Sequence, residues 1–205
     1  MARTFDALDD GLVAWIARQP VVFVATAPLA PNGHVNVSPK GTDGTFRVLG
    51  PTTVAYLDLV GSGAETVAHL HENGRIVCMF CAFEGPPKIL RLHGRGRAVG
   101  PDDPKFADLL EGFAPTASTR NLARSVVVVE VERIADSCGF GVPLMDFIGD
   151  RDHAPRWAEQ QAAKQGPCWK AAYIGAKNAA SLDGLPGVDA APHEPGAVAS
   201  EIAVR

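Results

Sequence analysis

The stretch TFRVLGPTTVAYLDLVGSGAETVAHLHENGRIVCMF, residues 45–80, decides the fold. Two runs rich in apolar and β-branched residues, 45–50 and 52–59, predict two strands. A helical segment follows at 61–74, and the apolar run 75–83 predicts the next strand. We therefore expect one short helix inserted between the strands of a sheet, with its start placed at a strand end.

Both ends of this predicted helix carry local signals. Ser62 stands three residues before Glu65, the spacing of a capping box, and Gly74 suits the position just after the helix. The glycines flanking Ser62 would also let a ligand approach the free N–H groups of the helix start, which attract anions. Simple capping and an anion site both remain open from this segment alone.

Other strands and helices are predicted on both sides of this stretch. The further strands are expected at 21–27, 34–39, 89–100 and 124–134, and the further helices between residues 5 and 20, at 102–113 and at 156–166. Seven strand-like segments with few helices predict a mainly β protein whose antiparallel sheet closes into a barrel.

The chain is expected to divide into three parts. A barrel domain takes residues 1–150, and a C-terminal helix and loop at 151–190 pack on the barrel or on a partner subunit. Residues 191–205 form a flexible tail rich in proline and alanine. Within the second part, 173–188 is predicted to be a loop.

The composition is that of an ordinary globular protein, with 205 residues, 46% hydrophobic, 20% charged, and a formal net charge of −4. This acidic balance argues against a general nucleic-acid or anionic-membrane surface, so any phosphate site must be local. No run approaches the roughly 20 apolar residues of a membrane span. The first residues lack the apolar middle of a signal peptide. We expect a cytoplasmic protein without a nucleic-acid or membrane partner.

The C-x-x-C spacing of Cys78 and Cys81 suggests a redox or zinc motif at first sight. It lies in a dense apolar strand, however, and residues three apart in a strand point to opposite faces. No second Cys/His pair follows at zinc spacing. We predict buried, reduced thiols. His69 and His71 do not form a metal pair either, because residues two apart on a helix do not face each other.

Lys40 lies at the end of the strand HVNVSPKG, residues 34–41, beside a proline and a glycine. Together with the helix start at 61–63, this cation predicts a site for an anion such as phosphate, although a solvated turn lysine is the alternative. The P-loop motif is absent.

Three segments carry a resemblance to a known family: VNVSPKG, AYLDLVGSGAETVAHLHENGRIVCMF and ILRLHGRGRAV. They resemble the pyridoxamine 5′-phosphate oxidase-like, FMN-binding split-barrel proteins over roughly residues 15–135. The likeness is greatest to an uncharacterised branch that also carries a later DGLPG, here 183–187. The resemblance implies a split β-barrel and a homodimer, with two FMN molecules in clefts between the subunits.

The resemblance also implies which residues hold the cofactor. Lys40 matches the basic residue that ends the family's phosphate-binding strand. The segment that contacts flavin and phosphate corresponds here to Leu57, Asp58, Ser62, Gly63 and Thr66. Asn36 and Ser38 either touch the isoalloxazine edge or point to water.

The chain departs from the true oxidases at two points. They have Ser-Arg-Lys at the helix start, where this chain has Ala64, Glu65 and Thr66. Arg91 or Arg95 would supply the missing positive charge, in one version across the dimer, but both are as well explained as a solvated strand face. The substrate-binding Arg/His motif of the oxidases is not evident, so we do not assign pyridoxamine phosphate as substrate.

The leading hypothesis is an FMN-dependent oxidoreductase acting on a small molecule, with the redox chemistry supplied by the flavin. The alternatives are a non-catalytic module holding FMN, haem, another ligand or nothing, and a reductase that uses the deazaflavin F420.

Near the C-terminus, Asn178, Ser181 and Asp183 stand among turn-forming residues, as in binding loops, but an unliganded turn fits equally well. The aromatic residues Trp157, Trp169 and Tyr173 either close over a flavin or anchor this segment to the core.

Overall fold

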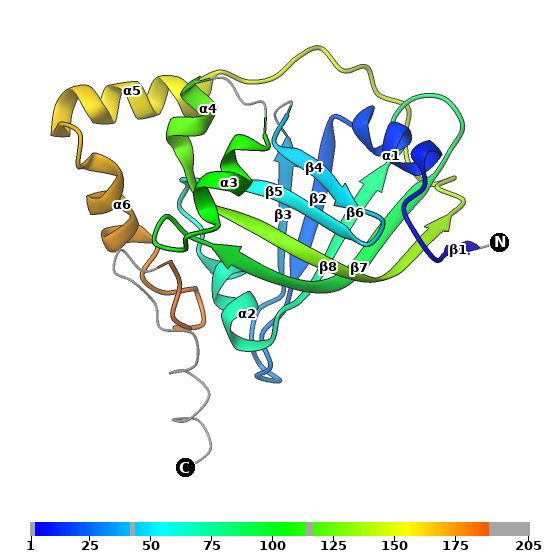
Figure 1. Cartoon of the computed structure of the whole chain (residues 1–205), viewed down its shortest axis with the longest axis horizontal. Helices are drawn as coiled ribbons and strands as arrows, with labels where there is room; N and C mark the ends of the chain where they lie inside the picture. Colours follow the sequence, from blue (N-terminus) through cyan, green and yellow to red (C-terminus); the bar gives the residue numbers. More distant parts are fainter. Residues whose placement is uncertain (1–2, 42–43, 114–116, 189–205) are drawn as a thin grey trace.

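The computed structural model describes residues 3–41, 44–113 and 117–188. Within them one antiparallel sheet has eight strands, which follow the order β3-β2-β6-β7-β8-β5-β4, with β1 paired to β8 (Figure 1). The strands are β1 Arg3–Phe5, β2 Val21–Thr26, β3 Asn36–Gly41, β4 Phe46–Gly50, β5 Thr53–Leu59, β6 Arg75–Cys81, β7 Ile89–Val99 and β8 Ala123–Ser137. All seven predicted strands are present.

Short helices lie around this sheet (Figure 1). They are α1 Asp10–Ala17, α2 Glu65–Asn73, α3 Phe106–Glu111, α4 Ala117–Leu122, α5 His153–Gln165 and α6 Trp169–Lys177. As predicted, α2 is inserted between the strands β5 and β6, and it packs against β2, β6 and β7.

The sheet is curled but open. In the described part of the chain the two ends of the strand path, β3 and β4, pair only with β2 and β5. The expectation of a sheet closed on itself was therefore wrong, whereas the mainly β, split-barrel architecture is confirmed. Side chains on the inner face form the core, with Val24, Cys78 and Leu92 completely buried.

The alternation of apolar and polar residues explains which side chains of β7 are buried. In β7, Leu90 and Leu92 are fully buried and Arg91 and His93 are not, as expected for alternating residues. In β8 the valines 126–129 are all buried because both faces of that strand are covered.

Three helix predictions need correction. Helix α2 begins at Glu65, later than expected, and α3 begins at Phe106. The segment 169–177 forms the helix α6 although we predicted a loop from residue 173. Trp169 and Ile174 of α6 are buried in a cluster with Val60 and with α4 and α5 residues, so tertiary packing outweighs the local helix-weakening effect of Gly175.

The cluster around Trp169 also holds the C-terminal helices α5 and α6 in place. Trp157 packs edge-on against Trp169 and Tyr173, at ring-centroid distances of 5.3 and 5.0 Å. These aromatic residues anchor the C-terminal helices, and the chain then enters the loop 178–188 beside α2 (Figure 1). The predicted tail, 191–205, and part of the turn after β3 lie outside the described residues.

Candidate functional site

The end of β3 and the start of α2 line one small cavity. Its volume is about 130 Å³, and its walls are Ser38, Lys40, Leu59, Gly61, Gly63, Glu65, Thr66 and Arg124. Four of the predicted site residues are thus brought together: Ser38, Lys40, Gly63 and Thr66. The juxtaposition of the Lys40 strand end and the glycine turn, on which the anion hypothesis depends, is present.

Asp58 lies beneath this cavity and joins its two cations. Its side chain is only 1% exposed and accepts hydrogen bonds from Arg124 Nε at 2.7 Å and Ser125 Oγ at 3.2 Å. The Lys40 ammonium lies 3.6 Å from the other carboxylate oxygen. Asp58, for which the sequence predicts a cofactor contact, is absent from the cavity wall and holds the cationic side chains in place, because a buried carboxylate requires such partners.

Arg124 is the site residue that the sequence analysis missed. Its Nη2 donates to the carbonyl oxygen of Gly63 at 2.7 Å, and its Nη1 to that of Gly61 at 3.4 Å, in addition to the bonds with Asp58. The side chain is 5% exposed. Its only sequence signal is a charged residue at the start of a strand whose next residues are apolar, because the partner Asp58 is 66 positions away.

Asn36 supports the hydroxyl groups of the site. Its amide nitrogen donates to Thr66 Oγ1 at 3.0 Å, and its amide oxygen accepts from Ser38 Oγ at 3.3 Å. Because Thr66 Oγ1 accepts this bond, its own hydrogen is available to a ligand. Asn36 therefore orients two cavity-lining hydroxyls rather than pointing to water.

The same network continues to a buried histidine. Asn36 also donates to Thr26 Oγ1 at 3.3 Å, and Thr26 Oγ1 is 2.9 Å from His69 Nδ1. His69 is completely buried, and burial lowers the pKa of its imidazole below the usual 6.5.

No side chain caps the start of α2. Its N-cap is Ala64, and Ser62 is exposed and absent from the cavity wall, so the predicted Ser62–Glu65 capping box is wrong. The predicted αL glycine at the other end is confirmed, since Gly74 has φ +69°. The first intrahelical hydrogen bond of α2 runs from Ala68 N to Ala64 O. Free amides at its first turn thus give the site a partial positive charge.

Formal charges at the cavity balance. Lys40 and Arg124 are opposed by Asp58 and by the carboxylate of Glu65, which is part of the cavity wall. The side chains of the site therefore offer directed donors without a net formal charge, and the helix amides add only a partial positive charge.

Arg91 and Arg95 do not take part in this site within the chain. Arg91 Nη1 donates to Ser137 Oγ at 3.0 Å. Arg95 Nη1 donates to the carbonyl oxygen of Asn73 at 2.7 Å, at the C-terminal end of α2. The two ends of the nine-residue helix α2 are about 13 Å apart. Arg95 is therefore too far from the start of α2 to neutralise the charge of a phosphate there. Arg124 occupies the place that we had proposed for these two arginines.

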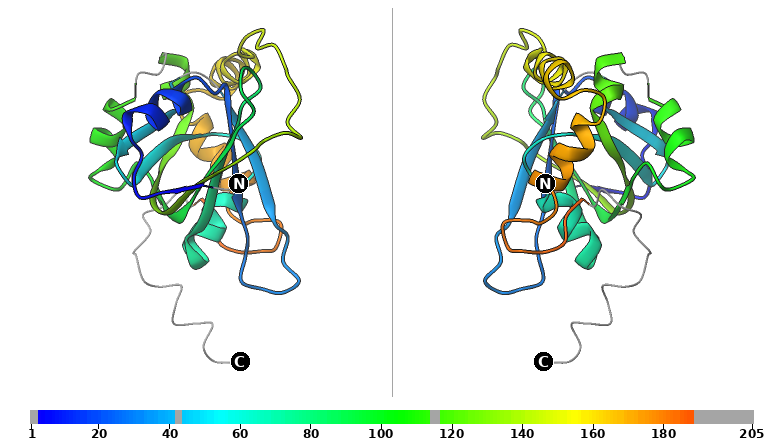
Figure 2. Two further views of the ribbon diagram at one scale, coloured as in Figure 1. Left: turned by 90° about the vertical axis from the view of Figure 1, so that its right-hand side faces the viewer. Right: turned by 90° about the vertical axis from the view of Figure 1, so that its left-hand side faces the viewer.

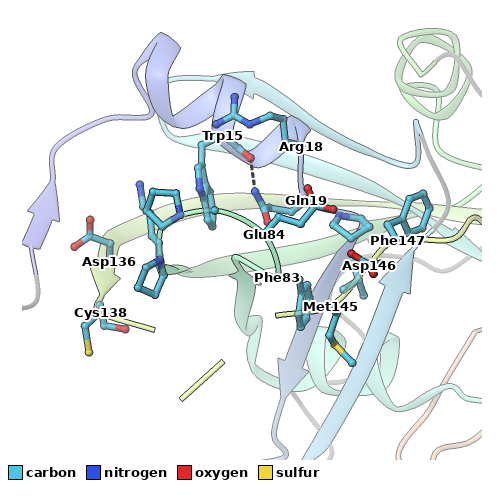
Figure 3. Close-up of a pocket in the computed structure, with 17 residues that line it drawn as sticks. Trp15, Arg18, Gln19, Phe83, Glu84, Asp136, Cys138, Met145, Asp146 and Phe147 are labelled. Atoms are coloured by element: carbon cyan, nitrogen blue, oxygen red, sulfur yellow. Dashed lines mark hydrogen bonds between the residues drawn. The ribbon is translucent and has the colours of Figure 1, made fainter. Parts of the chain in front are cut away.

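A larger cavity of about 980 Å³ opens elsewhere, between α1, the β6–β7 turn and the segment after β8 (Figure 3). Aromatic rings of Trp15, Phe83 and Phe147 form part of its wall (Figure 3). None of the predicted site residues lines it. We place the candidate site at the smaller cavity, because only that one collects two cations, two hydroxyls and a helix start.

The described residues contain no group of histidine, cysteine or acidic side chains arranged to hold a metal ion. Cys78 and Cys81 are buried free thiols, as predicted, and burial raises the pKa of Cys78 to about 12. No helix in the described part is long and apolar enough to span a bilayer.

The fold and cavity define a class of split-barrel protein that presents a small polar pocket at the start of its inserted helix. A family model described as pyridoxamine 5′-phosphate oxidase matches residues 8–138. The pyridoxamine 5′-phosphate oxidase family protein ustO of Aspergillus flavus is 38% identical over 206 residues, covering 94% of this chain and 80% of the relative. The chain belongs to the pyridoxamine 5′-phosphate oxidase family.

Solved structures resemble the chain more distantly. HupZ of Group A Streptococcus is 21% identical, with a TM-score of 0.47 over 62% of this chain and 90% of that chain. An FMN-binding protein of Syntrophomonas wolfei subsp. wolfei is 17% identical, with a TM-score of 0.45 over 58% of this chain and 78% of that chain. These likenesses are too weak to transfer a ligand to this chain.

Proposed function

We propose that this protein binds a flavin by its phosphate group and acts, as a homodimer, as an FMN-dependent oxidoreductase. The observation that carries the proposal is the convergence of Lys40 and Arg124 with the uncapped start of α2. Membership of the pyridoxamine 5′-phosphate oxidase family supports the flavin.

The cavity fits a phosphate group in size and in chemistry. Its volume of about 130 Å³ equals that of roughly four water molecules, which suits a phosphate group and excludes the flavin ring. Lys40, the Thr66 hydroxyl and the α2 amides are donors. Gly63 leaves space beside them, because a Cβ atom at this position would lie only 2.8 Å from Glu65 Oε2. The ring would lie outside this cavity.

When bound, the flavin would supply the electron transfer. The side chains of the site would bind and orient it. Of the two cations that line the cavity among the described residues, Lys40 can turn from Asp58 to a ligand, whereas Arg124 already makes hydrogen bonds to Asp58, Gly61 and Gly63. Asn36 would keep the Thr66 hydroxyl directed at the phosphate.

The charge balance favours one alternative cofactor. A phosphate monoester carries nearly two negative charges at pH 7, whereas a phosphodiester such as that of F420 carries one. With Glu65 and Asp58 opposing Lys40 and Arg124, a singly charged phosphodiester meets less repulsion. F420 therefore remains the second candidate.

An exposed apolar face supports the homodimer. On β3, Val37 is 61% exposed and is paired in register with Ala25, which is paired with Val77. Two residues further along the strands, Phe23 of β2 and Met79 of β6 pair on the same face and are partly exposed. Apolar surface on an edge strand and its neighbours favours association with a second subunit.

The test begins with the purified protein, in which native mass spectrometry and the absorption spectrum identify any bound flavin or F420. Lys40→Ala is then titrated with FMN and with riboflavin, which lacks the phosphate. We expect FMN affinity to fall at least tenfold, as for a lost charged hydrogen bond, and riboflavin affinity to stay unchanged.

Lys88→Ala is the matched control, because Lys88 lies in the wall of the larger cavity, with its ammonium 4.8 Å from the Trp15 ring centroid. Unchanged FMN affinity in Lys40→Ala would exclude the phosphate role of Lys40. A protein that binds FMN but is reduced by no donor would support the non-catalytic alternative.

A further inference from the structure

The C-terminal loop 178–188 lies against the candidate site, although it is more than a hundred residues away in sequence. Both side views show the loop, in orange, at the same end of the molecule as α2 and the β2–β3 hairpin (Figure 2). Three contacts attach it there, and each involves the start of α2 or the chain that precedes β3.

The first contact is made by Asn178, which is completely buried. Its Nδ2 donates to the carbonyl oxygen of Gly61 at 2.8 Å, the same oxygen that Arg124 Nη1 approaches at 3.4 Å. The Asn178 Oδ1 atom is buried without a hydrogen-bond partner among the described residues. Because peptide bonds are planar and trans here, fixing the Gly61 carbonyl also fixes the direction of the Ser62 amide.

The second contact is a close crossing at Gly187. A Cβ atom on Gly187 would lie 2.2 Å from the carbonyl oxygen of Asn178 and 2.8 Å from the Cβ of Ala64, the N-cap of α2. Only glycine allows this approach. Val188 N also donates to the Asn178 carbonyl at 2.7 Å, which closes the loop on itself.

The third contact is at the loop tip. Leu182 N donates to Glu65 Oε1 at 3.4 Å, so the loop holds the carboxylate that would oppose a phosphate. Asp183 accepts from His34 N at 2.8 Å and lies 2.6 Å from His34 Nδ1. These bonds tie the tip to the segment leading into β3.

We propose that the loop 178–188 supports the phosphate pocket from outside the cavity wall and that Asn178 is its positioning residue, which sets the glycine turn for a flavin phosphate. This inference rests on the proposed function. Asn178 and Arg124 hold the Gly61 carbonyl from two elements far apart in sequence, β8 and the C-terminal loop. The role is positional, since Asn178 is absent from the cavity wall.

The test compares Asn178→Ala and Asn178→Asp with the wild type in FMN and riboflavin titrations. Both variants lose the amide donor, and we expect FMN binding to weaken about tenfold, the loss expected for one buried hydrogen bond, with riboflavin binding unchanged. Leu182→Ala is the matched control: its side chain is 72% exposed and its backbone N–H remains, so FMN affinity should not change. Equal weakening of FMN and riboflavin, or unchanged FMN binding, would overturn the role.

A flavin-independent measurement separates this inference from the proposed function. If the wild type binds no flavin, the proposed function fails, and amide hydrogen exchange of residues 61–67 still tests the positioning. We expect faster exchange there in Asn178→Ala, and unchanged exchange would overturn the inference. If Asn178→Ala does not fold, Asp183→Ala removes a tether at the surface and should raise exchange in the same segment; no rise would overturn the inference.

Discussion

Asp58 shows how single side chains organise the candidate site. A buried carboxylate is costly unless cations and hydroxyls surround it. Asp58 has Lys40 from β3 and the adjacent residues Arg124 and Ser125 from the start of β8 as partners. The carboxylate thereby brings two cations to the start of α2.

We predict that Asp58→Asn destabilises the protein by about 3 kcal/mol, because removing one charge of a buried pair leaves the other uncompensated. Urea denaturation measures the free energy of unfolding. Glu132→Gln is the control, since its partner Arg95 is 57% exposed and such surface pairs contribute only about 0.5 kcal/mol. Equal effects of the two variants would show that Asp58 is not a structural ion-pair centre.

His69 makes the stability depend on pH. Burial lowers the pKa of its imidazole, so the folded protein binds fewer protons than the unfolded chain below about pH 6.5. The stabilisation is complete above that pH and is lost as the pH falls through the lowered pKa.

We therefore predict that the free energy of unfolding decreases as the pH falls below about 6.5, and that His69→Gln flattens this dependence. Thermal unfolding between pH 5 and 8 measures the slope. The same slope in His69→Gln as in the wild type would assign the titration to other groups.

Among the helices, α1 and α2 begin in different ways. Asp9 caps α1 by accepting a hydrogen bond from Leu12 N at 2.8 Å. At α2, Ser62 plays no such part and the first-turn amides stay uncapped. A capped start stabilises the helix, whereas an open start leaves donors available to a ligand.

We predict that Asp9→Ala costs about 1 kcal/mol of stability and Ser62→Ala less than about 0.5 kcal/mol. Chemical denaturation of the two variants gives both values side by side. A loss at Ser62 as large as that at Asp9 would mean that Ser62 caps α2 in solution.

Across the whole molecule, the curled sheet has two faces of different character. The inner face is buried, whereas the outer face of β3, β2 and β6 exposes Val37 and its apolar neighbours. The segment after β8 adds more exposed apolar surface, with Phe140 at 81% and Ile148 at 100% exposure. Such surfaces favour a partner subunit.

We predict that Val37→Lys produces a monomer where the wild type is a dimer, because a charge on this face would be buried by association. Size-exclusion chromatography with light scattering measures the mass. Leu49→Lys, on the opposite edge strand β4, is the control and should remain dimeric. A dimer that survives Val37→Lys would place the interface elsewhere.

Much of the fold could be predicted because it depends on local patterning. Alternating apolar residues specify the faces of β7, and the inserted helix follows from the punctuation around 61–74. Lys40 and the glycine turn were predictable for the same reason, since a strand end and a helix start are local features. Helix α6 was not predictable, because it is stabilised by contacts of Trp169 and Ile174 with distant residues.

Residue pattern alone thus predicted the strands, the inserted helix, the buried thiols and half of the lining of the candidate site. Tertiary structure decided that Arg124, rather than Arg91 or Arg95, joins Lys40, and that Asn178 reaches Gly61 across 117 positions. The physical reason is that strand and helix patterns reflect neighbours along the chain. A buried ion pair or a closing loop depends instead on how the sheet curls and brings distant segments together.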